Sequence, residues 1–255
     1  MEEKIRFVLH TLIVLWYIIA SVWAVFLSDF ENVTDDRVLD MQKYGGRYFT
    51  TWNFLIHLIY FASALVEDFL SNYTPCKSCL EIIAEVKGYM FTTFLVPFTT
   101  YVFTVFWSLF KYDRELVFPE ATDEVVPWWF NQTVHTIVFA FMVLEFYFTE
   151  RNVQHKWKHI LVGFTISIIA YYSLFFYTKS KTDRYFYGLF HQLAPWQIVL
   201  FLIASYFFGL ITIQIGIYIQ QLVQMTKNPV IINKGNNSNQ SEPVYNRKTN
   251  KKHIS

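Results

Sequence analysis

Residues 127–145, PWWFNQTVHTIVFAFMVLE, decide the fold that this chain is expected to adopt. The stretch is mostly apolar and opens with a proline and two tryptophans, which is typical of a membrane span starting at the water–lipid boundary. His135 lies inside it, about two helical turns past Pro127. Lipid offers an imidazole no hydrogen bond, so this histidine needs a polar partner or a chemical role.

The composition outside this stretch is also that of an integral membrane protein. Of the 255 residues, 54% are hydrophobic and only 16% are charged, whereas a soluble domain carries about 25% charged residues. The sequence predicts an all-α integral membrane protein with six transmembrane helices in one domain, residues 1–227, followed by a disordered polar tail, residues 228–255. The other five predicted spans are 7–27, 49–66, 88–110, 160–177 and 193–223.

The distribution of basic residues predicts the orientation of these spans. Lys and Arg are more frequent in the N-terminus, the second and fourth loops and the tail than in the other three loops, largely because of the tail. The N- and C-termini are therefore expected to be cytosolic, in either the endoplasmic reticulum or the plasma membrane. Asn32, which opens an N-x-T match in the first loop, would then be available for glycosylation.

This orientation places the starts of the second and fourth spans on the same, non-cytosolic face. Thr50 and Asn53 form part of a polar stripe in the second span, and Asn131 and His135 form one in the fourth. Polar stripes avoid lipid, so the two are expected to line a shared cavity. His135 lies about 12 Å below the start of its span, deeper than Thr50, so contact requires tilt or a recessed loop.

A threonine and a histidine are sufficient for nucleophilic catalysis, because the imidazole can take the proton from the attacking hydroxyl. The same residues are also common in packing roles. A threonine near a helix start often caps the helix, and a membrane histidine often pairs with an asparagine. Spacing alone favours packing over catalysis.

Other motifs give little support for a metal or a cofactor. A lone C-x-x-C at Cys76 and Cys79 is interpreted as two loop thiols. His155 and His159 lack the glutamate of a zinc motif and lie in a basic loop. His10 is expected at the membrane interface. Phosphate-loop, dinucleotide and serine-elbow motifs are absent from the sequence, and a net charge of +1 gives no bulk attraction to nucleic acid.

Three segments nevertheless resemble a known family. They are YGGRYFT at 44–50, FW at 106–107 followed by YDRELVFP at 112–119, and VPWWFNQTVHT at 126–136. The chain from residue 44 to about 223 is similar to the family of the androgen-induced protein and the androgen-dependent TFPI-regulating protein. The resemblance implies a six-span membrane hydrolase of fatty acid esters of hydroxy fatty acids, with the threonine nucleophile at Thr50 and the histidine at His135.

We therefore expect a membrane-embedded lipid ester hydrolase that uses no metal or cofactor and has lipids as its partners. Asn53 and Asn131 are candidate oxyanion donors, and Arg47 and Arg114 are candidates for binding a substrate carboxylate. Two alternatives remain open. One is a non-enzymatic lipid-binding or transport protein using the same cavity. The other is a structural membrane partner whose polar stripes hold helices together.

Overall fold

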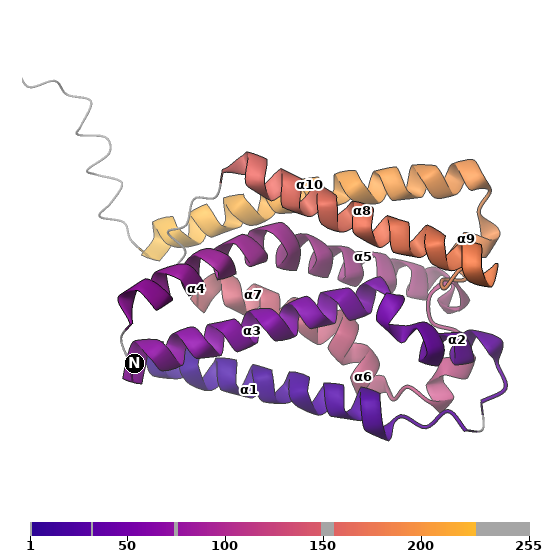
Figure 1. The fold of residues 1–255 in the computed structure, drawn as a ribbon, viewed down its shortest axis with the longest axis horizontal. Helices are drawn as coiled ribbons and strands as arrows, with labels where there is room; N and C mark the ends of the chain where they lie inside the picture. Colours follow the sequence, from indigo (N-terminus) through magenta and orange to yellow (C-terminus); the bar gives the residue numbers. More distant parts are fainter. Residues whose placement is uncertain (1, 32, 74–75, 149–155, 228–255) are drawn as a thin grey trace, which may run out of the picture.

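The computed structural model describes residues 2–31, 33–73, 76–148 and 156–227. The predicted disordered tail and Asn32 lie outside these residues. The described part is helical, with no strand in it, and its long helices lie side by side (Figure 1). Within that part, five helices are long and apolar enough to cross a membrane: Glu3–Leu27, Phe49–Tyr73, Lys77–Tyr112, Trp157–Thr182 and Pro195–Thr226.

These five helices correspond to five of the six predicted spans. The first comprises α1 (Glu2–Val22) and the π-helix η1 (Trp23–Leu27), and the second is α3 (Phe49–Tyr73). The third joins α4 (Lys77–Met90), η3 (Phe91–Leu95) and α5 (Val96–Tyr112) in one continuous run. The fifth and sixth are α8 (Trp157–Thr182) and α10 (Pro195–Lys227).

The predicted fourth span is helical but more polar than the others. It consists of α6 (Trp128–Gln132), the π-helix η6 (Thr133–Ile137) and α7 (Val138–Phe148), without a break. Figure 1 shows the start of α1 and the end of α10 at the same end of the bundle. The all-helical fold is thus confirmed, whereas the count of six spans and the cytosolic location of the termini stay predictions.

Two regions predicted as loops contain helices. The first loop holds α2 (Asp36–Tyr44) and the 3₁₀ turn η2 (Gly45–Arg47). The second is shorter than predicted, because α4 already begins at Lys77. Lys87 therefore lies inside α4 and not in the loop. Its ammonium is buried and lies 2.5 Å from the Glu67 carboxylate. Cys76 and Cys79 are joined by a disulfide at the start of α4, so the prediction of two loop thiols is wrong.

Three short helical elements lie in the connections between the long helices. They are the 3₁₀ turns η4 (Arg114–Leu116) and η5 (Glu120–Glu124) and the single-turn helix α9 (Leu189–Gln192). Arg37 of α2 donates to Glu115 of η4 at 2.7 Å and to Asp35 at 2.7 Å. The hydrogen bond from Arg37 holds the pKa of Asp35 below its usual value. This contact fixes α2 against η4 at the end of the bundle where α3 begins.

His10 is not at an interface but completely buried. Its Nδ1 lies 2.6 Å from the Asp68 carboxylate of α3, and its Nε2 lies 3.1 Å from the Glu145 carboxylate of α7. Arg6 donates to Asp68 at 2.7 Å, and the Tyr60 hydroxyl donates to Glu145 at 2.6 Å. The cluster gives the carboxylates of Asp68 and Glu145, which lie in apolar helices, polar partners. It also joins α1, α3 and α7.

Candidate active site

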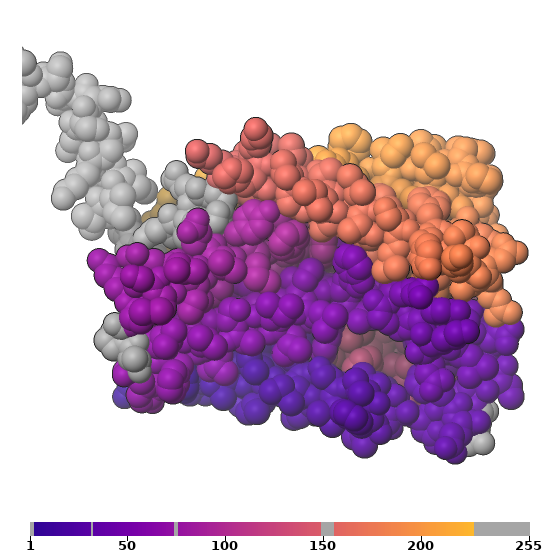
Figure 2. Space-filling model, viewed as in Figure 1, coloured from indigo at the N-terminus to yellow at the C-terminus, as the bar shows by residue number. Residues whose placement is uncertain are grey.

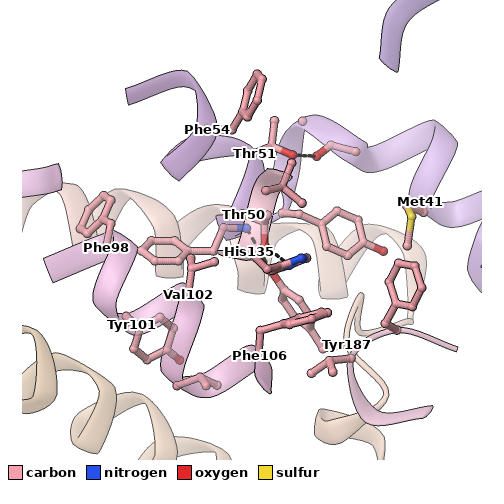
Figure 3. Close-up of a pocket in the computed structure, with 18 of the residues that line it drawn as sticks. Met41, Thr50, Thr51, Phe54, Phe98, Tyr101, Val102, Phe106, His135 and Tyr187 are labelled. Atoms are coloured by element: carbon pink, nitrogen blue, oxygen red, sulfur yellow. Dashed lines mark hydrogen bonds between the residues drawn. The ribbon is translucent and has the colours of Figure 1, made fainter. Parts of the chain in front are cut away.

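Thr50 and His135 meet near the start of α3. Thr50 Oγ1 lies 3.4 Å from His135 Nε2, although the two residues are 85 positions apart in the sequence (Figure 3). Thr50 is the second residue of α3, and His135 lies within the π-helix η6. Single π-helical turns are frequently found at functional sites. The structure thus brings together the two residues for which the sequence predicts a shared cavity.

The start of α3 leaves the Thr50 hydroxyl available. The carbonyl of Tyr48 accepts the N–H groups of Thr51 and Trp52, which begins the helix. The neighbouring hydroxyl of Thr51 donates to the Gly45 carbonyl at 2.7 Å and so closes the glycine turn instead. Of the two adjacent threonines, only Thr50 therefore faces His135.

The surroundings of His135 define which ring nitrogen carries the proton. Its Nδ1 lies 2.8 Å from the side-chain oxygen of Asn131 and 3.0 Å from the Asn131 carbonyl. Both are acceptors, so Nδ1 carries the hydrogen and Nε2 presents a lone pair to Thr50. The Phe106 ring stacks on the imidazole, with 3.4 Å between centroids and 10° between planes. Asn131 and Phe106 therefore fix the orientation of the imidazole.

The backbone at the start of α3 adds a hydrogen-bond donor beside the pair. Phe49 N–H donates to the Tyr187 hydroxyl at 3.1 Å, and burial raises the pKa of Tyr187. The next N–H, that of Thr50, has no acceptor among the residues that the structure describes. The first N–H groups of a helix lack intrahelical partners and carry partial positive charge, so they favour a nearby negative charge.

Thr50, Asn131 and His135 line a cavity of about 690 Å³. Most of its wall is apolar, and in Figure 3 it extends between Phe98 and Val102 of α5 on one side and Met41 of α2 on the other. Figure 2 shows the molecular surface hollowed between α1, α2 and α3. Two residues that line the cavity, Ala24 and Leu55, are exposed. Thr50 and His135 thus face an apolar cavity that opens laterally, between neighbouring helices.

Three predicted site residues do not line this cavity. Asn53 is buried and accepts a hydrogen bond from Thr99 at 3.0 Å. Arg47 donates to Thr178 at 2.9 Å and lies over the Tyr44 ring. Arg114 forms an ion pair with Asp123 at 2.8 Å. Their roles in binding stay predictions, because the structure places none of these side chains in the cavity wall.

The sequence reasoning missed Phe106 and Tyr187 as site residues. Phe106 lies in the FW pair of an aromatic-rich helix end, where one ring looks like any other interfacial anchor. Tyr187 lies in a segment far from both Thr50 and His135 in the sequence. Only the packing of α5 on η6, and of the α8–α9 connection on α3, identifies them.

Fold and site together define a multi-pass membrane protein with a hydroxyl–imidazole pair in an apolar cavity. Residues 5–221 match the FAR-17a/AIG1-like protein family, and the chain belongs to it. It is 33% identical to the androgen-dependent TFPI-regulating protein of Rattus norvegicus over 196 residues, covering 75% of this chain and 84% of the relative. No solved structure matches it.

Two further relatives show the spread of the family. The androgen-dependent TFPI-regulating protein of Mus musculus is 30% identical over 208 residues, covering 81% of this chain and 87% of the relative. The androgen-induced gene 1 protein of Homo sapiens is 26% identical over 153 residues, covering 56% of this chain and 63% of the relative. The similarity to both types of relative agrees with the family resemblance of the three sequence segments.

Proposed function

We propose that this protein hydrolyses lipid esters within the membrane, with fatty acid esters of hydroxy fatty acids as its substrates. Thr50 is the nucleophile and His135 is the general base. The observation that carries this proposal is the contact between Thr50 Oγ1 and His135 Nε2 at the wall of an apolar cavity. A hydroxyl needs a base within hydrogen-bond reach to act as a nucleophile, and 3.4 Å shortens readily on substrate binding.

The reaction divides into two steps. Thr50 Oγ attacks the ester carbonyl while His135 Nε2 takes its proton, and His135 then gives that proton to the departing alkoxide. An acyl-threonine and a free alcohol result. In the second step His135 takes a proton from water, the resulting hydroxide attacks the acyl-threonine, and the fatty acid leaves as Thr50 regains its proton.

The residues around the pair support these steps. Asn131 holds the Nδ1 proton and stabilises the imidazolium that forms when Nε2 is protonated, which is an orienting role. The oxyanion is assigned to the backbone N–H of Thr50. That donor lies at the positive end of the α3 dipole.

The cavity supports a lipid substrate. Its apolar wall buries hydrocarbon, and each buried CH₂ contributes about 0.8 kcal/mol. A non-enzymatic lipid-binding or transport protein would have a similar cavity open to the bilayer, and this is the second candidate function. Such a protein needs the cavity but has no need of a hydroxyl and a lone pair facing each other, so the pair favours the hydrolase.

A fluorophosphonate probe on membranes from cells expressing the full chain tests the nucleophile. We expect covalent labelling of the wild type and of Thr51→Ala, but none of Thr50→Ala at equal expression. His135→Ala should lower labelling and ester hydrolysis by about 10²-fold or more, the scale of a general base. Thr51→Ala is the matched control, since Thr51 is the next residue and its hydroxyl is engaged with Gly45. Labelling that persists in Thr50→Ala contradicts the proposal.

A further inference from the structure

The residues that line the cavity come from two sets of helices. One group, the deep arm, comes from α5, α8 and α10 and includes Phe98, Val102, Phe164, Ile168, Ser205 and Gly209. The other, the lateral arm, comes from α1, η1 and the α6–η6 run and includes Ser21, Ala24, Val25, Phe130 and Val134. Val134 and Phe130 belong to one hydrophobic cluster, whereas Phe98, Val102, Phe164 and Ile168 belong to another.

The position of His135 distinguishes the two arms chemically. In the proposed reaction the imidazolium donates its proton to the departing alkoxide oxygen, so the alcohol part must lie on the side of Thr50 that His135 occupies. His135 belongs to the same run of helix as Phe130 and Val134, which form the wall of the lateral arm. The acyl carbon remains bonded to Thr50 after the alcohol has left, and its chain must extend in the other direction.

We propose that the deep arm binds the acyl chain, that the lateral arm binds the alcohol part, and that Gly209 sets the length of acyl chain accepted. This assignment rests on the proposed hydrolase function. Tyr171 of α8 contacts Phe49 beside Thr50, and from Tyr171 to Phe164 the arm extends about 10 Å at 1.5 Å per residue. Gly209 and Phe164 are both buried and lie at its end farthest from Thr50 along the helices.

Gly209 keeps that end of the arm open. A Cβ added at Gly209 would lie 2.3 Å from the Cζ atom of the Phe164 ring, so the ring would have to move. Because Phe164 lines the cavity, the displaced ring takes space from the end of the deep arm. The first atoms of an acyl chain, close to Thr50, are unaffected. Only chains long enough to reach Phe164 lose binding.

A second glycine of α10 provides a matched control. A Cβ added at Gly216 would lie 2.8 Å from Val96 Cγ1, which is also a close contact between two helices. Neither Gly216 nor Val96 lines the cavity. Gly216→Ala therefore reproduces the packing strain on α10 without shortening the arm. For the other arm, Ala24→Leu adds bulk at an exposed cavity residue of η1.

The test measures kcat/KM of the purified full chain for two series of esters, one with increasing acyl length on a fixed alcohol and one with increasing alcohol length on a fixed acyl group. We expect Gly209→Ala to lower hydrolysis of the long acyl esters about tenfold relative to the short ones, on the scale that one or two methylenes contribute to specificity. The alcohol series should keep the wild-type profile. Ala24→Leu should do the reverse, and Gly216→Ala should change neither profile.

Three outcomes overturn the assignment. A Gly209→Ala profile that changes in the alcohol series, or equally in both, contradicts it while leaving Thr50-dependent hydrolysis intact. Wild-type hydrolysis that persists in Thr50→Ala, or no hydrolysis of either series, overturns the proposed function and the assignment with it. If Gly209→Ala does not fold, Ser205→Leu, which fills the same arm from the same helix, must give the selective loss of long acyl chains.

Discussion

At the scale of single residues, Asn131 makes two contacts that support His135. Its side-chain oxygen and its own backbone carbonyl both accept the hydrogen on Nδ1, at 2.8 and 3.0 Å. The second acceptor is independent of the side chain, because any residue at position 131 supplies a carbonyl. The imidazole tautomer is therefore determined partly by the backbone of the helix and partly by the choice of asparagine.

This duplication predicts a graded effect of mutation. Asn131→Ala should lower ester hydrolysis by about tenfold, less than His135→Ala, because the carbonyl still holds the Nδ1 hydrogen. The loss should appear in kcat, with KM nearly unchanged. Steady-state kinetics on the purified variants, with circular dichroism to confirm equal helix content, measures the difference. An Asn131→Ala enzyme as impaired as His135→Ala would show that the side chain alone orients the ring.

At the scale of the helices, the buried cluster of His10, Asp68 and Glu145 holds three of them together at a distance from the site. Asp68 lies 18 positions after Thr50 on the same helix, or about 27 Å along it. The cluster is therefore separate from the proposed chemistry. Its contribution is to fix α1 and α7 against α3, and with them the spacing between Thr50 and the α6–η6 run.

Removing one partner from this cluster should destabilise the bundle strongly. Asp68→Ala leaves Arg6 without its carboxylate and the buried His10 with Glu145 alone, and breaking a buried ion pair in this way typically costs about 3–5 kcal/mol. We expect a lower melting temperature in detergent and reduced expression. Ser63→Ala, on the exposed face of the same helix, should change neither, since its hydroxyl bonds only to the Ile59 carbonyl. Unchanged melting of Asp68→Ala would mean that the cluster contributes no net stability.

At the scale of the whole molecule, the cavity lies towards the end of the bundle where α3 and α6 begin and α2 and α9 lie (Figure 1). The basic residues predict that this end is non-cytosolic. A substrate from the bilayer would then reach Thr50 through the hollow between α1, α2 and α3, and the products would leave on the non-cytosolic side or into the same leaflet.

The orientation can be tested through the glycosylation sequence at Asn32. We expect the protein from a eukaryotic membrane to shift to lower mass on endoglycosidase treatment, and Asn32→Gln to lack that shift. A second acceptor sequence placed at the N-terminus should stay unmodified in the same cells. Modification of the N-terminal acceptor and not of Asn32 would place the starts of α3 and α6 on the cytosolic side, contrary to the charge distribution.

The sequence by itself determined the helical membrane fold and identified Thr50 and His135 as candidates for one cavity, but it left their contact open. Long apolar runs have one stable solution in lipid, because every backbone group must be satisfied within the segment. Polar residues at helical spacing on two such runs indicate a shared face, and the family motifs select the same two residues. The helices inside the loops were less predictable, because short polar segments such as 36–44 depend on contacts like Arg37 with Glu115.

Only the tertiary structure decided that Thr50 and His135 are in contact. The distance between Thr50 and His135 depends on how three helices pack, and no local pattern records it. The stacking of Phe106, the contact of Tyr187 and the burial of His10 between two carboxylates are all long-range, so their residues look unremarkable in sequence. The same holds for Gly209, whose missing side chain acquires meaning only because Phe164 of another helix lies against it.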